Sequence, residues 1–145
     1  MFTCSLGFIF DINLENVLLV HKNSPAWQKG LVNGVGGKIE VGESPLECMV
    51  RECQEETALV IPENSWQHFA TIKDKDGMSP GVHINVYAAM YHGAITDACK
   101  NDHEEIEWFL YQSLPDNVIS NLFFLVPMAR EKLRGHDAKS IIIQY

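Results

Sequence analysis

Hydrophobic positions along the chain follow two periods, one typical of strands and one typical of helices. Short runs rich in β-branched and aromatic residues predict strands over residues 4–10, 17–22, 68–72, 82–91, 106–111 and 140–145. The first two runs flank a turn-forming segment at residues 11–16, so we expect them to form a hairpin. Strands that flank two helical stretches indicate an α+β class with a mixed or antiparallel sheet.

The first helix is predicted to begin at Pro45 and to run to about Ala58. Ser44 is a suitable N-cap, Pro45 suits the first helical position, and Glu47 completes a capping box. The apolar residues of this segment recur at helical spacing and form one side of the helix: Leu46, Met49, Val50 and Cys53. The pattern is typical of an amphipathic helix.

Three further segments complete the expected architecture. Residues 118–134 have apolar spacing suited to a second helix, in which Pro127 is a point of kinking or breaking. Residues 34–37 read Gly-Val-Gly-Gly, which predicts flexible backbone that can approach a ligand closely. Residues 74–81 are expected to form a turn between two strands.

The composition is that of an ordinary globular protein with one domain, residues 1–145. The chain has 145 residues, of which 46% are hydrophobic, and a formal net charge of −8. An acidic chain lacks a basic face, so we expect no stable nucleic-acid binding. We expect no membrane association, because no signal peptide is visible and no apolar stretch approaches the roughly 18 residues of a membrane span. The four cysteines form no C-x-x-C pair, which favours a reducing cytoplasm over zinc or thioredoxin-type chemistry.

The charge excess lies in two short windows. Residues 37–59 hold six acids and two bases, and residues 97–107 hold five acids and one base, so each window has a net charge of −4. The rest of the chain is neutral. Either these windows are solvated acidic surfaces, or they meet around a cation.

The first window places three carboxylates on one helix face. Glu52, Glu55 and Glu56 stand at positions i, i+3 and i+4, where neighbouring Cβ atoms lie roughly 5–6 Å apart. Like charges this close repel each other, and a divalent cation removes the repulsion. Oxygen ligands suit Mg²⁺ or Mn²⁺. A solvated acidic stripe is the alternative reading of the same residues.

The segment around this helix resembles the Nudix box, G-x5-E-x7-R-E-U-x-E-E-x-G-U with U apolar. The fixed positions of the box are matched by Gly37, Glu43, Arg51, Glu52, Glu55 and Glu56. Cys53 and Leu59 fill the apolar positions. Ala58 stands where the family has a glycine that usually ends the helix, so we expect a less sharp end.

The resemblance implies a Nudix fold, an α/β/α sandwich around a mixed sheet, and a hydrolase that uses Mg²⁺ or Mn²⁺. Nudix hydrolases cleave a nucleoside diphosphate linked to another group. By resemblance, Glu52, Glu55 and Glu56 bind the metal with the Gly37 carbonyl, and Glu52 also takes a proton from the attacking water. Glu43 and Arg51 resemble the structural pair that orients the loop and the helix.

The second acidic window resembles the loop that often supplies one more metal ligand or base in this family. Glu104 is our first choice for this role and Glu105 the second; a solvated loop is the alternative. Lys22 and Lys38 match positions that are often basic in MutT-like members, where they could pair with phosphate oxygens. Exposed surface lysines are the alternative for both.

Residues 32–38 resemble the run W-N-G-F-G-G-K of MutT-like enzymes, with Val32 and Val35 in place of aromatic residues. In those enzymes the Asn contacts the base, which suggests Asn33 here, with Asn121 as a second base contact. A turn Asn beside Gly is the alternative for Asn33. Phe123 and Phe124 either stack on the base or pack in the core, and we expect the core.

The resemblance therefore predicts cleavage of a nucleoside triphosphate to a monophosphate and pyrophosphate. The base is expected to be a purine, including oxidised forms such as 8-oxo-dGTP. The alternatives are another diphosphate-linked substrate, namely a nucleotide sugar, ADP-ribose or an RNA 5′ end, and a non-catalytic nucleotide sensor. The expected partner is a nucleotide small molecule, and the protein is expected to be a monomer or homodimer.

Overall fold

The structure is a computed structural model that describes residues 2–74, 81–136 and 140–144. Its strands form one sheet, as expected. They are β1 (Phe2–Phe10), β2 (Asn16–His21), β3 (Val32–Asn33), β4 (Val35–Lys38), β5 (Gln67–Lys73), β6 (Val82–Met90), β7 (Glu105–Leu110) and β8 (Ile141–Gln144). The predicted turn at residues 74–81 lies largely outside the described residues.

The sheet is mixed and is built around β1. This strand pairs antiparallel with β2 and β4 and parallel with β6, in the order β3-β2-β1-β6-β5-β8. The expected hairpin of β1 and β2 is present, with Ile9 opposite Leu18 and Phe10 opposite Val17. β7 pairs with β2, and β8 runs parallel to β5 at one edge.

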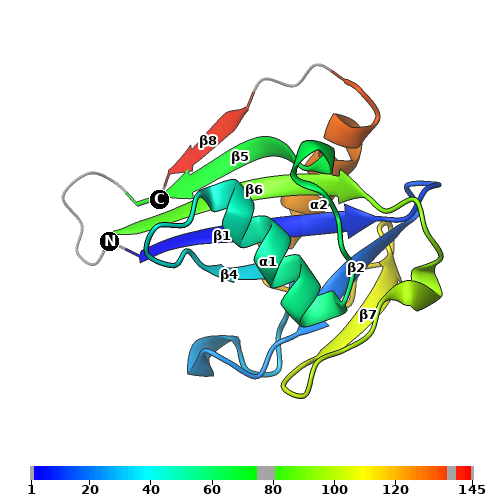
Figure 1. Cartoon of the computed structure of the whole chain (residues 1–145), viewed down its shortest axis with the longest axis horizontal. Coiled ribbons are helices and arrows are strands. Elements are labelled where there is room, and N and C mark those ends of the chain that lie inside the picture. Colours follow the sequence, from blue (N-terminus) through cyan, green and yellow to red (C-terminus); the bar gives the residue numbers. More distant parts are fainter. Residues whose placement is uncertain (1, 75–80, 137–139, 145) are drawn as a thin grey trace.

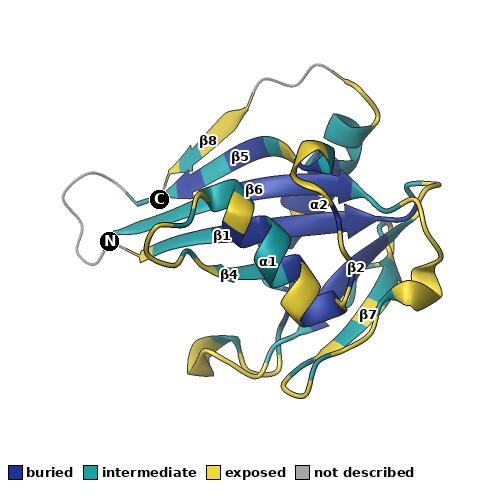
Figure 2. Ribbon diagram, in the orientation of Figure 1, coloured by how far each residue is buried: buried dark blue, intermediate teal, exposed yellow. Residues whose placement is uncertain are grey.

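One helix covers each face of the sheet, so the layers are α/β/α as the sequence predicts (Figure 1). The helices are α1 (Pro45–Thr57) and α2 (Leu122–Leu133). Alternation along β1 separates the two cores: Phe8 and Phe10 pack with α2, and Ile9 packs with α1. The buried residues accordingly lie in the sheet between the helices (Figure 2). None of the described helices is long and apolar enough to cross a membrane.

The start of α1 is fixed by the predicted capping box. Ser44 Oγ accepts a hydrogen bond from the Glu47 N–H at 3.0 Å, and the Glu47 carboxylate accepts one from the Ser44 N–H at 3.0 Å. The apolar side, which includes Cys48 and Cys53, is buried against the sheet. This contact sets the rotation of α1 about its axis and hence the direction of its carboxylates.

The end of α1 differs from expectation. We expected a less sharp end at Ala58, but Ala58 itself adopts the left-handed conformation, with φ 63°. Its N–H donates to the Gln54 carbonyl, which closes the helix as a glycine would. The alanine therefore bears backbone strain that a glycine would avoid.

Ala58→Gly is expected to stabilise the protein by about 1 kcal/mol, because it removes left-handed strain at an exposed position. The melting temperature should rise by roughly 2–4 °C in a calorimetric scan. Ala94→Gly is the control, since Ala94 is also exposed but has an ordinary φ of −74°. If both variants lower the melting temperature alike, Ala58 carries no strain.

Residues 34–37 were expected to be flexible, and that expectation is wrong. They lie in or beside strand β4, which pairs with β1 with Gly36 opposite Leu6 and Gly37 opposite Ser5. A Cβ at Gly36 would lie only 2.0 Å from the Ser5 carbonyl oxygen. Glycine is needed here for close packing of two strands rather than for mobility.

The second helix begins later than predicted and passes through Pro127. Val118 forms a bridge to Val32, and its neighbour Ile119 donates its N–H to the Val32 carbonyl at 2.9 Å, so this segment is extended. α2 then continues past Pro127 to Leu133 without ending. Helical spacing alone could not show that the first turn would be used for pairing with β3.

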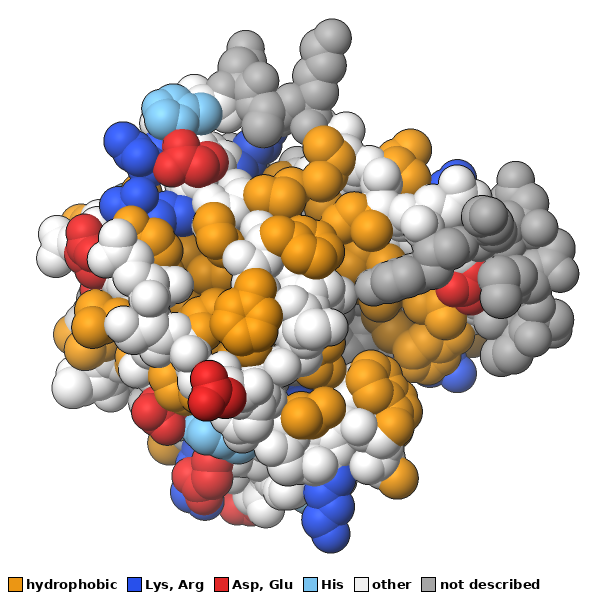
Figure 3. Space-filling model, turned by 180° about the vertical axis from the view of Figure 1, so that it is seen from behind, with side chains coloured by type: hydrophobic (Ala, Val, Ile, Leu, Met, Phe, Trp, Pro, Cys, Tyr) orange, Lys and Arg blue, Asp and Glu red, His pale blue; other side chains and the backbone are white. Residues whose placement is uncertain are grey.

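The two phenylalanines of α2 were expected to be buried and are not. Phe123 is 55% exposed and Phe124 is 44% exposed. Hydrophobic side chains are accordingly visible on the face that carries α2 (Figure 3). The core positions of the helix are taken instead by Leu122, Leu125 and Val126.

Candidate active site

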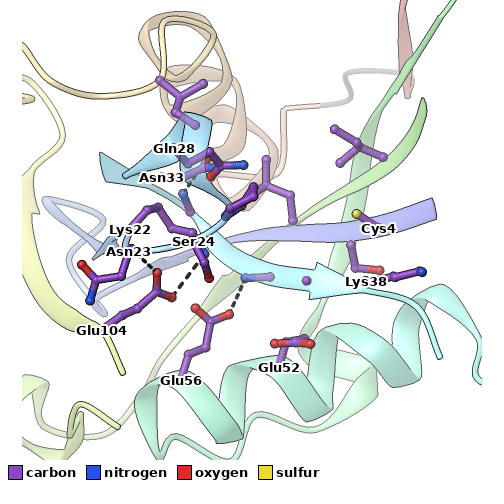
Figure 4. A pocket seen from close by; sticks show the side chains of 18 of the residues that line it. Cys4, Lys22, Asn23, Ser24, Gln28, Asn33, Lys38, Glu52, Glu56 and Glu104 are labelled. Atoms are coloured by element: carbon purple, nitrogen blue, oxygen red, sulfur yellow. Dashed lines mark hydrogen bonds and ion pairs between the residues drawn. The ribbon is translucent and has the colours of Figure 1, made fainter. Parts of the chain in front are cut away.

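One large pocket of about 740 Å³ gathers segments that are far apart in the sequence. Its walls come from β1, β4, α1, the start of β6, the loop after β2, the loop before β7 and the start of α2. Figure 4 shows Glu52 and Glu56 rising from α1 on one side of β4, with Asn33 and Gln28 on the other. Both acidic windows of the sequence therefore reach the same pocket.

Glu56 is the most buried carboxylate of the pocket, with only 6% exposure. Its Oε1 accepts a hydrogen bond from the Gly36 N–H at 2.9 Å. Its Oε2 is buried and has no hydrogen-bond partner within the described part of the chain. Burial raises the pKa of Glu56 to about 8, opposed by the positive charge of Lys22. An unpaired buried oxygen is costly unless a cation or donor meets it.

Glu52 lies against the glycine backbone of β4. A Cβ at Gly37 would lie 2.4 Å from Glu52 Oε1, so any other residue at this position would displace the carboxylate. Burial is the main cause that raises the pKa of Glu52. The glycine thus leaves room for the Glu52 carboxylate against the backbone of β4.

Arg51 ties the loop before α1 to the helix. Its guanidinium donates to both oxygens of Glu43, at 2.6 and 3.0 Å, and to the Lys38 carbonyl at 3.2 Å. It also donates to Glu52 at 2.9 Å and to Glu55 at 3.2 Å. The hydrogen bonds from Arg51 lower the pKa of Glu43 to about 2. This is the geometry expected of a pair that orients the loop.

Glu104 lies in the pocket, whereas Glu105 lies outside it. Glu104 accepts from Lys22 Nζ at 3.2 Å and from the Asn23 N–H at 2.6 Å. Glu105 is exposed and pairs with Lys100 at 3.1 Å. The lysine at position 22 therefore has a carboxylate partner inside the pocket and is not a free surface lysine.

The oxygen donors of the pocket are not yet arranged around a cation. Among the described residues, no three His, Cys, Asp or Glu side chains already converge as a metal cluster. Arg51 instead donates hydrogen bonds to Glu52 and Glu55. Glu56 Oε2, which has no partner among the described residues, and the Glu52 carboxylate beside Gly37 nevertheless supply oxygen ligands of the kind that Mg²⁺ and Mn²⁺ prefer. The residues fit such an ion if the hydrogen bonds from Arg51 to Glu52 and Glu55 break.

The other predicted residues also line the pocket. Asn33, Lys38 and Asn121 contribute to its wall, and Asn121 Oδ1 is buried without a hydrogen-bond partner among described residues. The sequence analysis did not identify Gln28, which accepts a hydrogen bond from Asn33, and it did not identify the apolar floor of the pocket. That floor includes Phe2, Cys4, Leu6, Val82 and Ile84. The alternation of side-chain directions along β1 could have predicted part of this floor, because the even-numbered positions of β1 face α2.

A mixed sheet between two helices, with a carboxylate helix against a glycine strand, defines a Nudix-type hydrolase fold. The sequence model of the NUDIX domain matches residues 5–125 of this chain. The chain therefore belongs to the NUDIX family, and the resemblance seen in the sequence is confirmed.

Solved structures share the fold at low sequence identity. A MutT protein from Bacillus halodurans is 18% identical, with a TM-score of 0.73 over 100% of this chain and 90% of its own. The NUDIX domain of Shewanella oneidensis NrtR, solved with ADP ribose, is 21% identical, with a TM-score of 0.65 over 90% of this chain and 87% of that domain. A MutT/nudix family protein from Enterococcus faecalis is 20% identical, with a TM-score of 0.63. It matches 74% of this chain, which spans only 43% of that protein.

Proposed function

We propose that the protein is a divalent-metal-dependent hydrolase of purine nucleoside triphosphates, including oxidised forms such as 8-oxo-dGTP. The products are the nucleoside monophosphate and pyrophosphate. The observation that carries the proposal is the buried Glu56 oxygen that has no partner among the described residues, on a side chain that lines the same pocket as Glu52, Glu55 and Glu104. Family membership supports hydrolysis of a nucleotide-linked substrate.

The metal site consists of Glu52, Glu55, Glu56 and the Gly37 carbonyl, with Glu104 as a further ligand. When bound, Mg²⁺ or Mn²⁺ neutralises phosphate charge and lowers the pKa of water. Glu52, whose pKa is already raised by burial, accepts the proton of the attacking water. Glu55 is the exposed residue of this helix face. In this proposal its hydrogen bond with Arg51 breaks, and Glu55 then binds the metal.

The positive groups have separate tasks. Lys22, which follows β2, and Lys38, the last residue of β4, line the pocket and face the phosphates. Lys22 also holds Glu104 in place, as their 3.2 Å contact indicates. Arg51 and Glu43 act at a distance, because they fix the loop between β4 and α1 rather than touch the substrate.

The base is proposed to lie on the apolar floor, beside the amides of Asn33 and Asn121. Amide groups offer both donors and acceptors to the edge of a purine. An apolar floor favours a flat base over a polar sugar at this end of the pocket. The proposed partner is thus a nucleotide small molecule, bound by a protein that we propose to be a monomer or homodimer.

ADP-ribose is the second candidate substrate, because the similar NrtR domain was solved with this ligand. The pocket volume of about 740 Å³ is in the range of pockets that bind such molecules. The two candidate substrates differ in their hydrolysis products. A nucleoside triphosphate yields pyrophosphate, whereas ADP-ribose yields AMP and ribose phosphate.

A substrate panel separates these candidates. The protein is incubated with Mg²⁺ or Mn²⁺ and purine triphosphates, 8-oxo-dGTP, ADP-ribose, a nucleotide sugar or a capped RNA 5′ end, and products are separated by ion-exchange chromatography. We expect the highest kcat/KM for a purine triphosphate. A higher value for any of the other diphosphates would reject our substrate assignment, and turnover of none would reject the enzyme itself.

A further inference from the structure

The amides of Asn33 and Gln28 form a hydrogen-bond relay whose direction is fixed by the backbone. The Gly34 N–H donates to Asn33 Oδ1 at 2.8 Å, and a backbone N–H can only donate. The oxygen of Asn33 must therefore face Gly34, which turns its amide nitrogen toward Gln28. That nitrogen donates to Gln28 Oε1 at 3.2 Å.

The relay leaves the amide nitrogen of Gln28 free. Its oxygen is used by Asn33, so the Nε2 group carries two N–H donors, and no hydrogen bond to Nε2 is found within the described part of the chain. Gln28 ends the short helix η1 (Ala26–Gln28), lines the pocket and lies beside Asn33 (Figure 4). A molecule bound at this end of the pocket therefore meets a donor.

We propose that Gln28 is a specificity-determining residue that donates a hydrogen bond to the base, and that it selects 6-oxopurines over 6-aminopurines. The inference rests on the proposed nucleotide site. The O6–N7 edge of a 6-oxopurine presents two adjacent acceptors, whereas the same edge of adenine presents an acceptor and an N6 donor. The second hydrogen of Asn33 Nδ2 adds another donor beside Gln28. An amino group at position 6 would face these donors with a donor of its own.

The relay makes this preference hard to reverse by rotation of the side chain. If the Gln28 amide flipped, its nitrogen would face the Asn33 nitrogen and one donor would lose its partner. Asn33 cannot flip in response, because its oxygen would leave the Gly34 N–H. Loss of such a base contact changes discrimination by about tenfold or more.

Inosine and adenosine nucleotides form the matched pair for a test, because they differ only at position 6 and the adjacent N1 proton. Dissociation constants for IMP and AMP are measured without metal by calorimetry, and kcat/KM for ITP and ATP is measured with Mg²⁺. Gln28→Glu keeps an oxygen for Asn33 and removes the donor. Gln67→Glu is the control, since Gln67 is exposed on β5 outside this pocket.

We expect the wild-type protein and Gln67→Glu to favour the inosine nucleotide by about tenfold, and Gln28→Glu to lose that preference. Thermal melting of each variant confirms that it is folded. An unchanged ratio in Gln28→Glu, or a wild-type preference for AMP, would overturn the inference. If the protein binds IMP over AMP through Gln28 yet hydrolyses no triphosphate, the proposed reaction fails while the role of Gln28 stands.

Discussion

Glu56→Gln is expected to lower kcat/KM by about 10³-fold, with Mg²⁺ or Mn²⁺ present, because it removes a charged oxygen from the metal site. Glutamine has almost the same shape and can still accept a hydrogen bond from the Gly36 N–H. The protein should therefore fold normally, and the loss should lie in the chemistry. Initial rates over a range of metal concentrations measure the effect.

The same variant is expected to stabilise the metal-free protein at high pH. The pKa of Glu56 is about 8 in the folded protein, against an ordinary value of 4.5, so the folded state holds the proton more tightly. The stability of the metal-free protein thus falls as pH rises from about 4.5 to about 8. A glutamine side chain does not titrate, so the variant should melt at a higher temperature than the wild type at pH 9, with little difference at pH 4.

Glu63→Gln is the matched control for both measurements, because Glu63 is exposed and does not line the pocket. It should change neither activity nor the pH dependence of melting. If Glu56→Gln kept wild-type activity, the metal assignment would be wrong. If it melted below the wild type at pH 9, burial of the carboxylate would not destabilise the protein as argued.

Arg51→Ala is expected to lower kcat/KM by about 10²-fold and to destabilise the protein by about 2 kcal/mol. The variant leaves Glu43, Glu52 and Glu55 without the guanidinium that joins them. Because Arg51 is only partly buried, we expect less than the roughly 3–5 kcal/mol typical of a fully buried pair. Urea unfolding measures the stability.

Arg134→Ala is the control for Arg51, since Arg134 is exposed and pairs with Glu131 at the surface. It should change stability by no more than about 0.5 kcal/mol. A double-mutant cycle with Glu43→Gln should give a coupling energy of about 1–3 kcal/mol. Additive effects of the two substitutions would show that the Arg51–Glu43 contact does not hold the loop.

Local patterns in the sequence predicted the parts of the fold that depend on neighbouring residues. The capping box at Ser44 and Glu47 forms as expected, because it needs only residues three apart. The same is true of the helix face with Glu52, Glu55 and Glu56. The resemblance to the Nudix box then supplied the fold around them.

Features that depend on distant residues could not be predicted in this way. Gly34–Gly37 looked mobile because the sequence does not show that β1 lies against it. The exposure of Phe123 and the burial of Glu56 likewise depend on how the helices rotate on the sheet. The free donor of Gln28 depends on a hydrogen bond between Gln28 in η1 and Asn33 in β3.

We propose that the carboxylates of this pocket carry out metal-dependent cleavage of a nucleoside triphosphate. The most direct test is phosphorus NMR of ITP incubated with the protein and Mg²⁺, with a parallel sample in EDTA. We expect signals of IMP and pyrophosphate with Mg²⁺ and no reaction in EDTA. Equal turnover in EDTA, or release of IDP and inorganic phosphate in place of pyrophosphate, would contradict it.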